Sequence, residues 1–311
     1  MNSAADRPAS RPAQDPTWQC VLVCWGTKYP VTLINHLIER ITAHSRSVPR
    51  FVLICDEPKA GLLPHVQTRL FPPFYMQKPF KSVGCQAKLA MFEEGVLPQD
   101  LPVVYIDLDT VIMGDMGEAV GFMKDQDTVL MLQSAIIPFG RIGRAIWRAT
   151  KGRKYARGNS SVVVFHPARC TYIARRFREL YERHPDFGFR PMVADERFIS
   201  WAAQPHMERI PKSFAVKFPN EFMFHLPAWL YIKALFPWVR ARREKLAAIT
   251  LCGLDIKPEK LLALRDAEVI ADNKDRKLVW SARVMGSSKQ KIIDFYRDII
   301  SLSSSSSSSS S

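Results

Sequence analysis

The stretch VVYIDLDTVIMGDM, residues 103–116, places two acidic side chains directly after a short apolar run. Residues 102–106 are apolar almost throughout, which predicts a strand buried on both faces. In extended geometry side chains two residues apart point the same way, so Asp107 and Asp109 share one side of the chain. Such a pair suits Mg²⁺ or Mn²⁺, which also bind phosphate oxygens and neutralise a diphosphate leaving group. A pair that merely caps or turns a strand is the commoner alternative.

The segments on either side alternate between apolar runs and helical periodicity. The predicted strands cover residues 20–25, 51–55, 128–132, 160–165 and 248–252. The predicted helices cover residues 29–44, 84–95, 167–183, 195–203 and 289–302. Apolar strands separated by helices predict an α/β fold with a mostly parallel central sheet flanked by helices.

Glycine or acidic residues follow three of these strands. Gly26 and Thr27 follow the first strand, Asp56 the second, and the aspartate pair the third. Ligands of open α/β sheets bind beyond the carboxyl ends of the strands, so we expect these residues to be neighbours. Neither a GxxxxGK[ST] loop nor a GxGxxG fingerprint occurs, which argues against a P-loop and a dinucleotide site.

Four blocks occur in an order that resembles a known family. They are AKLAMF at residues 87–92, VYIDLDTVI at 104–112, GNSSVVVF at 158–165 and ADERFIS at 194–200. Together with WGTKYP at 25–30, they resemble the GT-A nucleotide-sugar glycosyltransferases, most closely the glycogenin-like group and related bacterial surface-polysaccharide transferases. The resemblance covers roughly residues 18–257. It implies one GT-A domain over residues 18–260, with a C-terminal extension over 261–302.

The resemblance also implies a donor site. Asp107 and Asp109 would hold Mn²⁺ or Mg²⁺ and the diphosphate of a nucleoside-diphosphate sugar, with a UDP-sugar favoured. The implied donor-binding residues are Trp25, Gly26 and Thr27 around the nucleoside, Asp56 at the base or ribose, Lys88 at phosphate or sugar, and Asn159 and Ser160 at the sugar.

The chemistry implied is transfer of the sugar to a hydroxyl of a glycan or glycolipid. Asp195 or Glu196 would lie near the anomeric carbon or the acceptor hydroxyl. A carboxylate there can act as general base if the enzyme inverts configuration. A non-catalytic basic binding module on the same fold, engaging nucleic acid or an anionic membrane, is the alternative from another class.

One position departs from the family pattern. The family has a His-Gly pair after a later strand, and its histidine completes the metal site, whereas this chain has Cys252 followed by Gly253. The resemblance thus places Cys252 at the third metal-ligand position, where a thiolate is softer than Mg²⁺ prefers but tolerable for a borderline metal. Three explanations stay open: Asp255 or His225 is the third ligand, fewer protein groups hold the metal, or the site is impaired.

The chain is strongly basic, with 44 Lys and Arg against 30 Asp and Glu and a net charge of +14. Residues 140–183 hold twelve basic and two acidic side chains, so most of the excess is local. No nucleic-acid-binding signature accompanies this patch, and we do not expect a nucleic acid partner. An anionic donor, an anionic acceptor or an anionic membrane surface suits it better.

Residues 228–243 (AWLYIKALFPWVRARR) combine aromatic and arginine side chains. This composition is typical of an interfacial membrane anchor, and also of a buried helix followed by a solvated basic turn. Pro237 breaks any single long helix, and residues 222–239 are too interrupted to span a bilayer.

The remaining features concern the compartment and the ends of the chain. The six cysteines show no paired CxxC spacing, which indicates reduced thiols and a cytoplasmic protein, with a peripheral position on the inner face of the membrane as one option. Residues 1–17 have no apolar signal region and are expected to be a disordered leader. The serine run 303–311 is expected to be a disordered tail.

Overall fold

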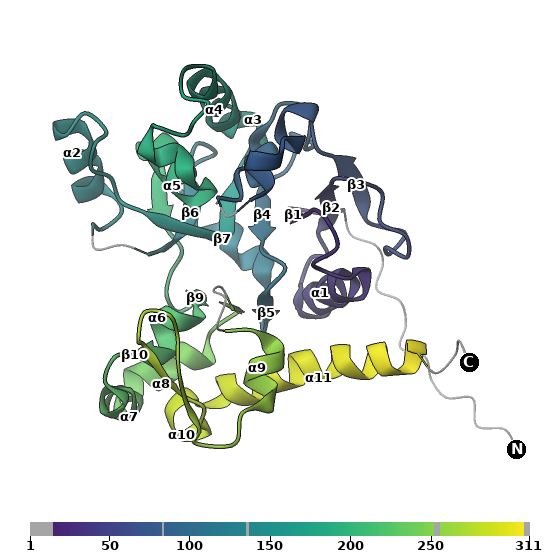
Figure 1. The fold of residues 1–311 in the computed structure, drawn as a ribbon, viewed down its shortest axis with the longest axis vertical. Coiled ribbons are helices and arrows are strands. Elements are labelled where there is room, and N and C mark those ends of the chain that lie inside the picture. Colours follow the sequence, from purple (N-terminus) through teal and green to yellow (C-terminus); the bar gives the residue numbers. More distant parts are fainter. Residues whose placement is uncertain (1–14, 83, 135–136, 252–255, 308–311) are drawn as a thin grey trace, which may run out of the picture.

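The computed structural model describes residues 15–82, 84–134, 137–251 and 256–307. Seven strands form the central sheet: β1 (Gln19–Cys24), β2 (Arg50–Cys55), β3 (Gln67–Leu70), β4 (Val103–Ile106), β6 (Val129–Gln133), β7 (Gly158–Phe165) and β8 (Met207–Arg209). Their order is β3-β2-β1-β4-β7-β6-β8 (Figure 1). All neighbours are parallel except β7, which runs antiparallel to both β4 and β6. The predicted mostly parallel sheet is therefore confirmed.

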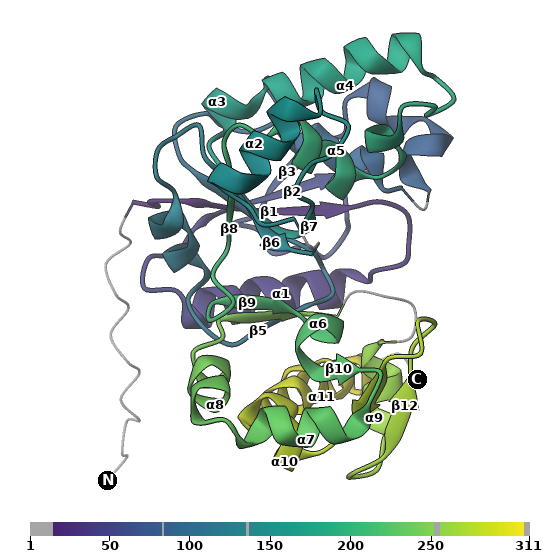
Figure 2. The same ribbon diagram turned by 90° about the vertical axis from the view of Figure 1, so that its left-hand side faces the viewer.

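Both faces of this sheet are buried. One face packs under α1 (Val31–His44), and the other under α4 (Tyr172–Arg183), α5 (Asp195–Ala202) and η3 (Gln86–Phe92), where η marks a 3-10 helix (Figure 2). Successive residues of β1 alternate between the two cores, as a pleated strand requires. An apolar run without polar interruption is the sequence that this double burial demands.

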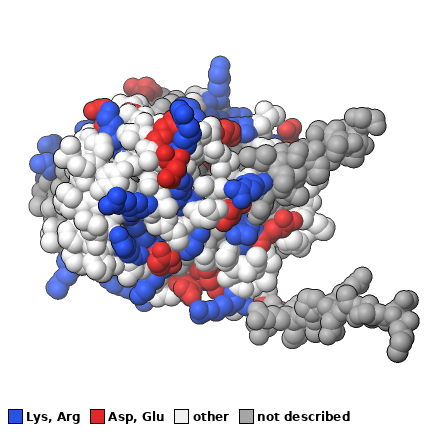
Figure 3. Space-filling model, turned by 90° about the horizontal axis from the view of Figure 1, so that it is seen from below, with Lys and Arg blue, Asp and Glu red and all other residues white. Residues whose placement is uncertain are grey.

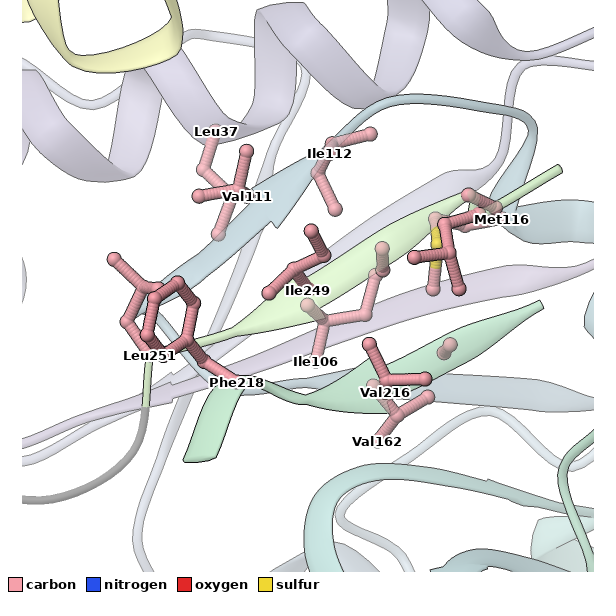
Figure 4. Close-up of a cluster of buried hydrophobic side chains, with 14 of the residues drawn as sticks. Leu37, Ile106, Val111, Ile112, Met116, Val162, Val216, Phe218, Ile249 and Leu251 are labelled. Atoms are coloured by element: carbon pink, nitrogen blue, oxygen red, sulfur yellow. The ribbon is translucent and has the colours of Figure 1, made fainter. Parts of the chain in front are cut away.

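A second, smaller sheet adjoins the first. Its strands are β5 (Thr110–Ile112), β11 (Ala248–Thr250) and β9 (Ala215–Lys217), in the order β5-β11-β9. Side chains from both sheets and from α1 meet in one cluster, where Ile106 of β4, Val111 of β5 and Leu37 of α1 are all buried (Figure 4). The chain passes from the large sheet to the small one through residues 107–109, so Asp107 and Asp109 lie at the seam between two packed sheets.

The C-terminal part is built on this core. A third sheet has the order β10 (Met223–Phe224), β13 (Lys277–Val279) and β12 (Val269–Ala271). The helices here are α6 (Phe218–Phe222), α7 (Pro227–Leu235), α8 (Pro237–Glu244), α9 (Pro258–Ala263), α10 (Ala282–Met285) and α11 (Ser287–Ser307). On α11, Phe295 packs its ring 4.8 Å from that of His36 in α1. The expected extension thus contributes side chains to the main core.

Several predicted elements differ in detail. The predicted helix over 84–95 is the 3-10 helix η3, with i to i+3 hydrogen bonds such as Glu93 N–H to the Ala90 carbonyl. Its side chains are buried almost all round, so there is no solvated face to favour a regular amphipathic α-helix. The predicted helix over 167–183 is divided at Thr171 into α3 (Pro167–Cys170) and α4. α11 also includes residues 303–307 of the serine run, because extending an existing helix needs no new nucleus.

The remaining elements are short. They are η1 (Pro73–Met76), η2 (Lys78–Lys81), η4 (Met116–Phe122), α2 (Arg141–Ala149) and η5 (Arg190–Val193). Among the described residues, the segment 222–239 is shared between several short elements, and none of the helices is long and apolar enough to cross a bilayer. Among the described residues, Cys20, Cys24, Cys55 and Cys170 are free thiols.

Candidate functional site

A cavity of about 590 Å³ opens beside the aspartate pair. Its walls come from the end of β1, the loop after it, the segment before η3, and residues 107–109. The lining residues are Val23, Cys24, Trp25, Lys28, Tyr29, Lys81, Ser82, Cys85, Lys88, Asp107, Leu108, Asp109 and Lys257. Four lysines and two aspartates face this space, so the cavity suits an anion larger than a single phosphate.

Lys88 holds the first aspartate of the pair. Its Nζ lies 2.6 Å from Oδ1 of Asp107, and the hydroxyl of Tyr105 donates to the same oxygen. Burial alone disfavours the charged ammonium, but Asp107, Tyr105 and Asp195 outweigh it and raise the pKa of Lys88 well above its ordinary value. Lys88 is therefore a fixed positive charge in the wall of the cavity.

Asp195 stands behind Lys88. Its Oδ2 lies 3.8 Å from Lys88 Nζ and accepts a hydrogen bond of 2.7 Å from the Ser160 hydroxyl. Burial raises the pKa of Asp195 to about 6, although Lys88 and Ser160 favour the carboxylate. The first turn of α5 orients this side chain, since the Asp195 N–H donates to the Gly84 carbonyl. An added Cβ at Gly84 would lie 2.5 Å from the Val193 carbonyl oxygen, so only glycine fits there.

Asn159 and Glu196 form the neighbouring contact between β7 and α5. The Asn159 amide donates to Oε2 of Glu196 at 2.9 Å, parallel to the Ser160 to Asp195 bond. The four residues predicted from two distant blocks are thus brought together. Asp195 lies against Lys88, and the described lining of the cavity includes none of the four.

Asp109 has a different environment. Its Oδ2 lies 3.5 Å from Nζ of Lys257, while its Oδ1 is buried and has no hydrogen-bond partner within the described residues. Burial and the charge of Asp107 raise the pKa of Asp109, against Lys257 and Lys88. A buried carboxylate oxygen without a partner is costly, and a cation beside it would remove that cost.

The loop after β1 forms the far wall of the cavity. Gly26 has φ +63°, a conformation that favours glycine, and its N–H donates to Oδ2 of Asp56 at 2.7 Å. The other oxygen of Asp56 accepts from Lys59 at 2.9 Å. Trp25 lines the cavity, whereas Asp56 fixes the loop, and Gly26 and Thr27 are not among its described lining residues.

The possible metal ligands of the cavity fit a divalent cation in part. Asp107 and Asp109 share one wall, and the partnerless oxygen of Asp109 is the kind of ligand that Mg²⁺ and Mn²⁺ prefer. No cluster of three His, Cys, Asp or Glu side chains occurs in the described segments. Cys252 and Asp255 lie outside the described residues. His225, the other suggested ligand, is not among the described lining residues of this cavity, and it lines a separate surface hollow with Gln133 and Arg276.

The basic patch of residues 140–183 does not face this cavity. Its members lie on α2, α3, α4 and the segment after α2, and none of them lines the cavity. Several are paired, as in Arg144 with Glu208, Arg169 with Asp127 and Arg178 with Glu93. The positive charge at the cavity comes instead from Lys28, Lys81, Lys88 and Lys257.

Several residues of this site were not predicted from the sequence. Tyr105 stands in the 104–112 block and in a predicted strand, but its contact with Asp107 was not expected. Tyr29 and Lys257 line the cavity, and neither was given a role at the site from the sequence alone. The one signal for Lys257 is its place five residues after Cys252, where the family has its metal-binding histidine.

Comparison with known proteins bears on the fold. No protein-family model and no curated protein matches this chain. Among solved structures, the galactosyltransferase LgtC in complex with donor and acceptor sugar analogues superposes with a TM-score of 0.54 at 12% identity, over 89% of this chain and 94% of LgtC. An active-site mutant of LgtC gives a TM-score of 0.53 at 10% identity, over 90% and 95%.

The bifunctional glycosyltransferase WbbM, in its apo form, is a further match, with a TM-score of 0.52 at 15% identity. The superposition covers 81% of this chain but 49% of WbbM, so this chain spans about half the length of that protein. Likeness at such identities concerns the arrangement of helices and strands. By its sheet order, its aspartate turn and these superpositions, the chain has the fold of the GT-A glycosyltransferases.

Proposed function

We propose that this protein is a glycosyltransferase that moves a sugar from a nucleoside-diphosphate donor, with UDP favoured, to a hydroxyl of a glycan or glycolipid. The observation that carries the proposal is the placement of Asp107 and Asp109 between Lys88 and Lys257 in the wall of one cavity. The structures that it resembles include LgtC with donor and acceptor sugar analogues, which supports this class of reaction.

The charges of the cavity suit a nucleoside diphosphate. Lys88 and Lys257 neutralise the aspartates when the cavity holds no anion, and Lys28 and Lys81 add two further positive charges. A diphosphate entering this space would meet fixed cations without further reorganisation of the protein, which is the arrangement that stabilises a departing diphosphate. Trp25, which also lines the cavity, offers an aromatic surface to the base or ribose.

Asp107 and Asp109 would hold Mn²⁺ or Mg²⁺ in the proposed enzyme. Such an ion supplies charge neutralisation at the diphosphate leaving group. The buried Oδ1 of Asp109, which has no hydrogen-bond partner among the described residues, supports this assignment, because a cation that binds the carboxylate offsets the burial that raises the pKa of Asp109.

Asp195 and Glu196 have different roles in the proposed enzyme. Asp195 lies against Lys88, so we assign it to holding the ammonium in place rather than to contact with the donor. Glu196 is tied to Asn159 by its Oε2, and we keep it as the candidate for contact with the reacting sugar or the acceptor hydroxyl. Both positions follow from the packing of α5 against β7.

A thermal-shift series with UDP, GDP and CDP, each with and without Mn²⁺, tests the proposal. We expect one nucleotide to raise the melting temperature, with a larger rise when Mn²⁺ is present, because binding to the native state stabilises it. The control variant Glu208→Gln should show the same nucleotide-dependent shifts as wild type, since Glu208 pairs with Lys124 and Arg144 outside the cavity. If no nucleotide shifts the melting temperature under any condition, the proposed function is wrong.

A further inference from the structure

Helix α7 does not have the burial pattern of a helix that faces water. Its core side is made by Leu230 and Ala234, while its outward side carries Trp229, Ile232 and Leu235, which are 41%, 45% and 63% exposed. The one charged residue of α7, Lys233, points inward instead. A water-facing helix ordinarily places its charged side chain outward and its apolar ones in the core.

A buried carboxylate explains the inward lysine. Glu221 is buried and pairs with Lys233 at 3.4 Å, and with Arg242 and Arg243 of α8 at 2.7 Å each. Three cations therefore converge on one acid beneath α7 and α8, which fixes how both helices are rotated. The alternative of a buried helix followed by a solvated basic turn therefore holds only in part for residues 228–243. One side of α7 is core and the other is exposed, and Arg242 and Arg243 are paired rather than solvated.

Exposed apolar side chains follow one another along the chain from β10 through α7 to α8. Trp238 of α8 is 66% exposed, and its ring stacks on that of Phe236 with centroids 4.5 Å apart. At the other end, Leu226 and Phe224 are exposed, and the Phe224 ring lies 6.3 Å from that of Trp229. We call the exposed side chains Phe224, Leu226, Trp229, Ile232, Leu235 and Trp238 the apolar ridge. Half of the large apolar side chains exposed in the described residues belong to it, so it is more than scattered exposure.

Basic side chains adjoin the ridge. Arg240 lies on α8 and Lys245 directly follows that helix, the Lys212 carbonyl accepts from Arg242, and the Arg283 guanidinium lies 5.9 Å from the Tyr231 ring of α7. All four are exposed, and none forms an ion pair within the described chain. Residues 222–243 contain no Asp or Glu. Figure 3, which views the side of the molecule where α7, α8 and α10 lie, shows an uncharged area with Lys and Arg beside it.

We propose that the apolar ridge docks this protein onto an anionic lipid bilayer. Tryptophan and leucine side chains enter the boundary between headgroups and acyl chains, and a basic border is attracted by anionic headgroups. The basic border argues against the obvious alternative occupant, which is a second copy of the chain. A two-fold interface would place the same basic border against itself, which is unfavourable. This inference does not rest on the proposed function.

Vesicle flotation of the full-length protein tests the proposal. The probes are phosphatidylcholine vesicles and equimolar phosphatidylcholine and phosphatidylglycerol vesicles. We expect the protein to float with the anionic vesicles and to be released by high salt. The triple variant Trp229→Gln, Leu235→Gln and Trp238→Gln should bind at least roughly tenfold more weakly, because three apolar side chains no longer enter the bilayer.

Two further triple variants separate the effect of the apolar ridge from that of the basic border and from loss of the fold. Val48→Gln, Leu70→Gln and Ile142→Gln change three equally exposed apolar residues elsewhere and should float like wild type. Lys212→Gln, Lys245→Gln and Arg283→Gln keep the ridge and should weaken binding to anionic vesicles alone. Unchanged melting temperatures show that each variant is folded. Equal flotation of wild type and ridge variant overturns the proposal, as does a wild-type dimer that binds no vesicle and becomes monomeric in the ridge variant.

Discussion

The ammonium of Lys88 lies 2.6 Å from Oδ1 of Asp107, so the first aspartate of the DLD turn is neutralised by a lysine from the segment η3. Both side chains are largely buried, and Asp195 stands on the far side of the same ammonium. One cation thus serves two acids, and the electrostatics of the site depend on it.

Replacement of Lys88 by methionine should destabilise the fold as well as the site. It leaves Asp107 and Asp195 buried without their shared cation, and breaking a buried ion pair from one side costs about 3–5 kcal/mol. Urea denaturation measures this loss. Lys124→Met is the control, because Lys124 pairs with Glu208 at the surface and such pairs contribute less than about 1 kcal/mol. Equal effects of the two substitutions would contradict a buried role for Lys88.

The raised pKa of Asp195 predicts a pH dependence of stability. Its native pKa of about 6 exceeds the ordinary carboxyl value, so the native state binds the proton more tightly than the unfolded state does. The contribution of Asp195 is therefore fully present below about pH 4 and is lost as the pH rises through 6, by roughly 3 kcal/mol.

The measurement is the free energy of unfolding of wild type and Asp195→Asn between pH 4 and 7. The wild-type protein should lose stability relative to the variant as the pH rises. Asp127→Asn is the control, because Arg169 lowers the pKa of Asp127 below its ordinary value, so the contribution of Asp127 should not change between pH 4 and 7. Parallel curves for wild type and Asp195→Asn would show that the native pKa of Asp195 is ordinary.

Glu221→Gln tests the charge cluster that orients α7 and α8. The substitution leaves Lys233, Arg242 and Arg243 without their acid, and we expect a loss of about 3–5 kcal/mol in urea denaturation. The pKa of Glu221 is lowered, since the three cations outweigh its burial. Wild type should therefore lose this advantage over the variant as the pH falls below the ordinary carboxyl range. Glu182→Gln, at an exposed position of α4, should change little.

The sequence predicts the scaffold of this protein well because the scaffold is local. Runs such as 20–25 and 51–55 are apolar throughout, and only a strand buried on both faces needs such a run, so β1 and β2 were found within one residue. Asp107 and Asp109 both line the cavity as expected, but residues 108–109 form a turn, so the extended geometry assumed from their spacing is not what orients them. The GT-A fold followed from the order of short blocks along the chain.

The contacts within the site are less accessible because they join distant parts of the chain. Nothing near residue 109 indicates that Lys257 will lie 3.5 Å away, since β5 and β11 must first pair to bring them together. Helix α7 posed a different difficulty. It is apolar on both sides, so periodicity cannot tell which side is core, and the buried Glu221 that decides it lies outside the helix.

The central claim is that Asp107 and Asp109 form a metal-assisted diphosphate site, and Asp109→Asn tests it most directly. The amide keeps the shape but removes a buried charge of raised pKa, so the fold without ligand should be at least as stable as wild type. The decisive measurement is the Mn²⁺-dependent rise in melting temperature with the nucleoside diphosphate that wild type binds. We predict that Asp109→Asn abolishes the Mn²⁺-dependent part of this rise. A variant that retains the full Mn²⁺-dependent rise would contradict the account.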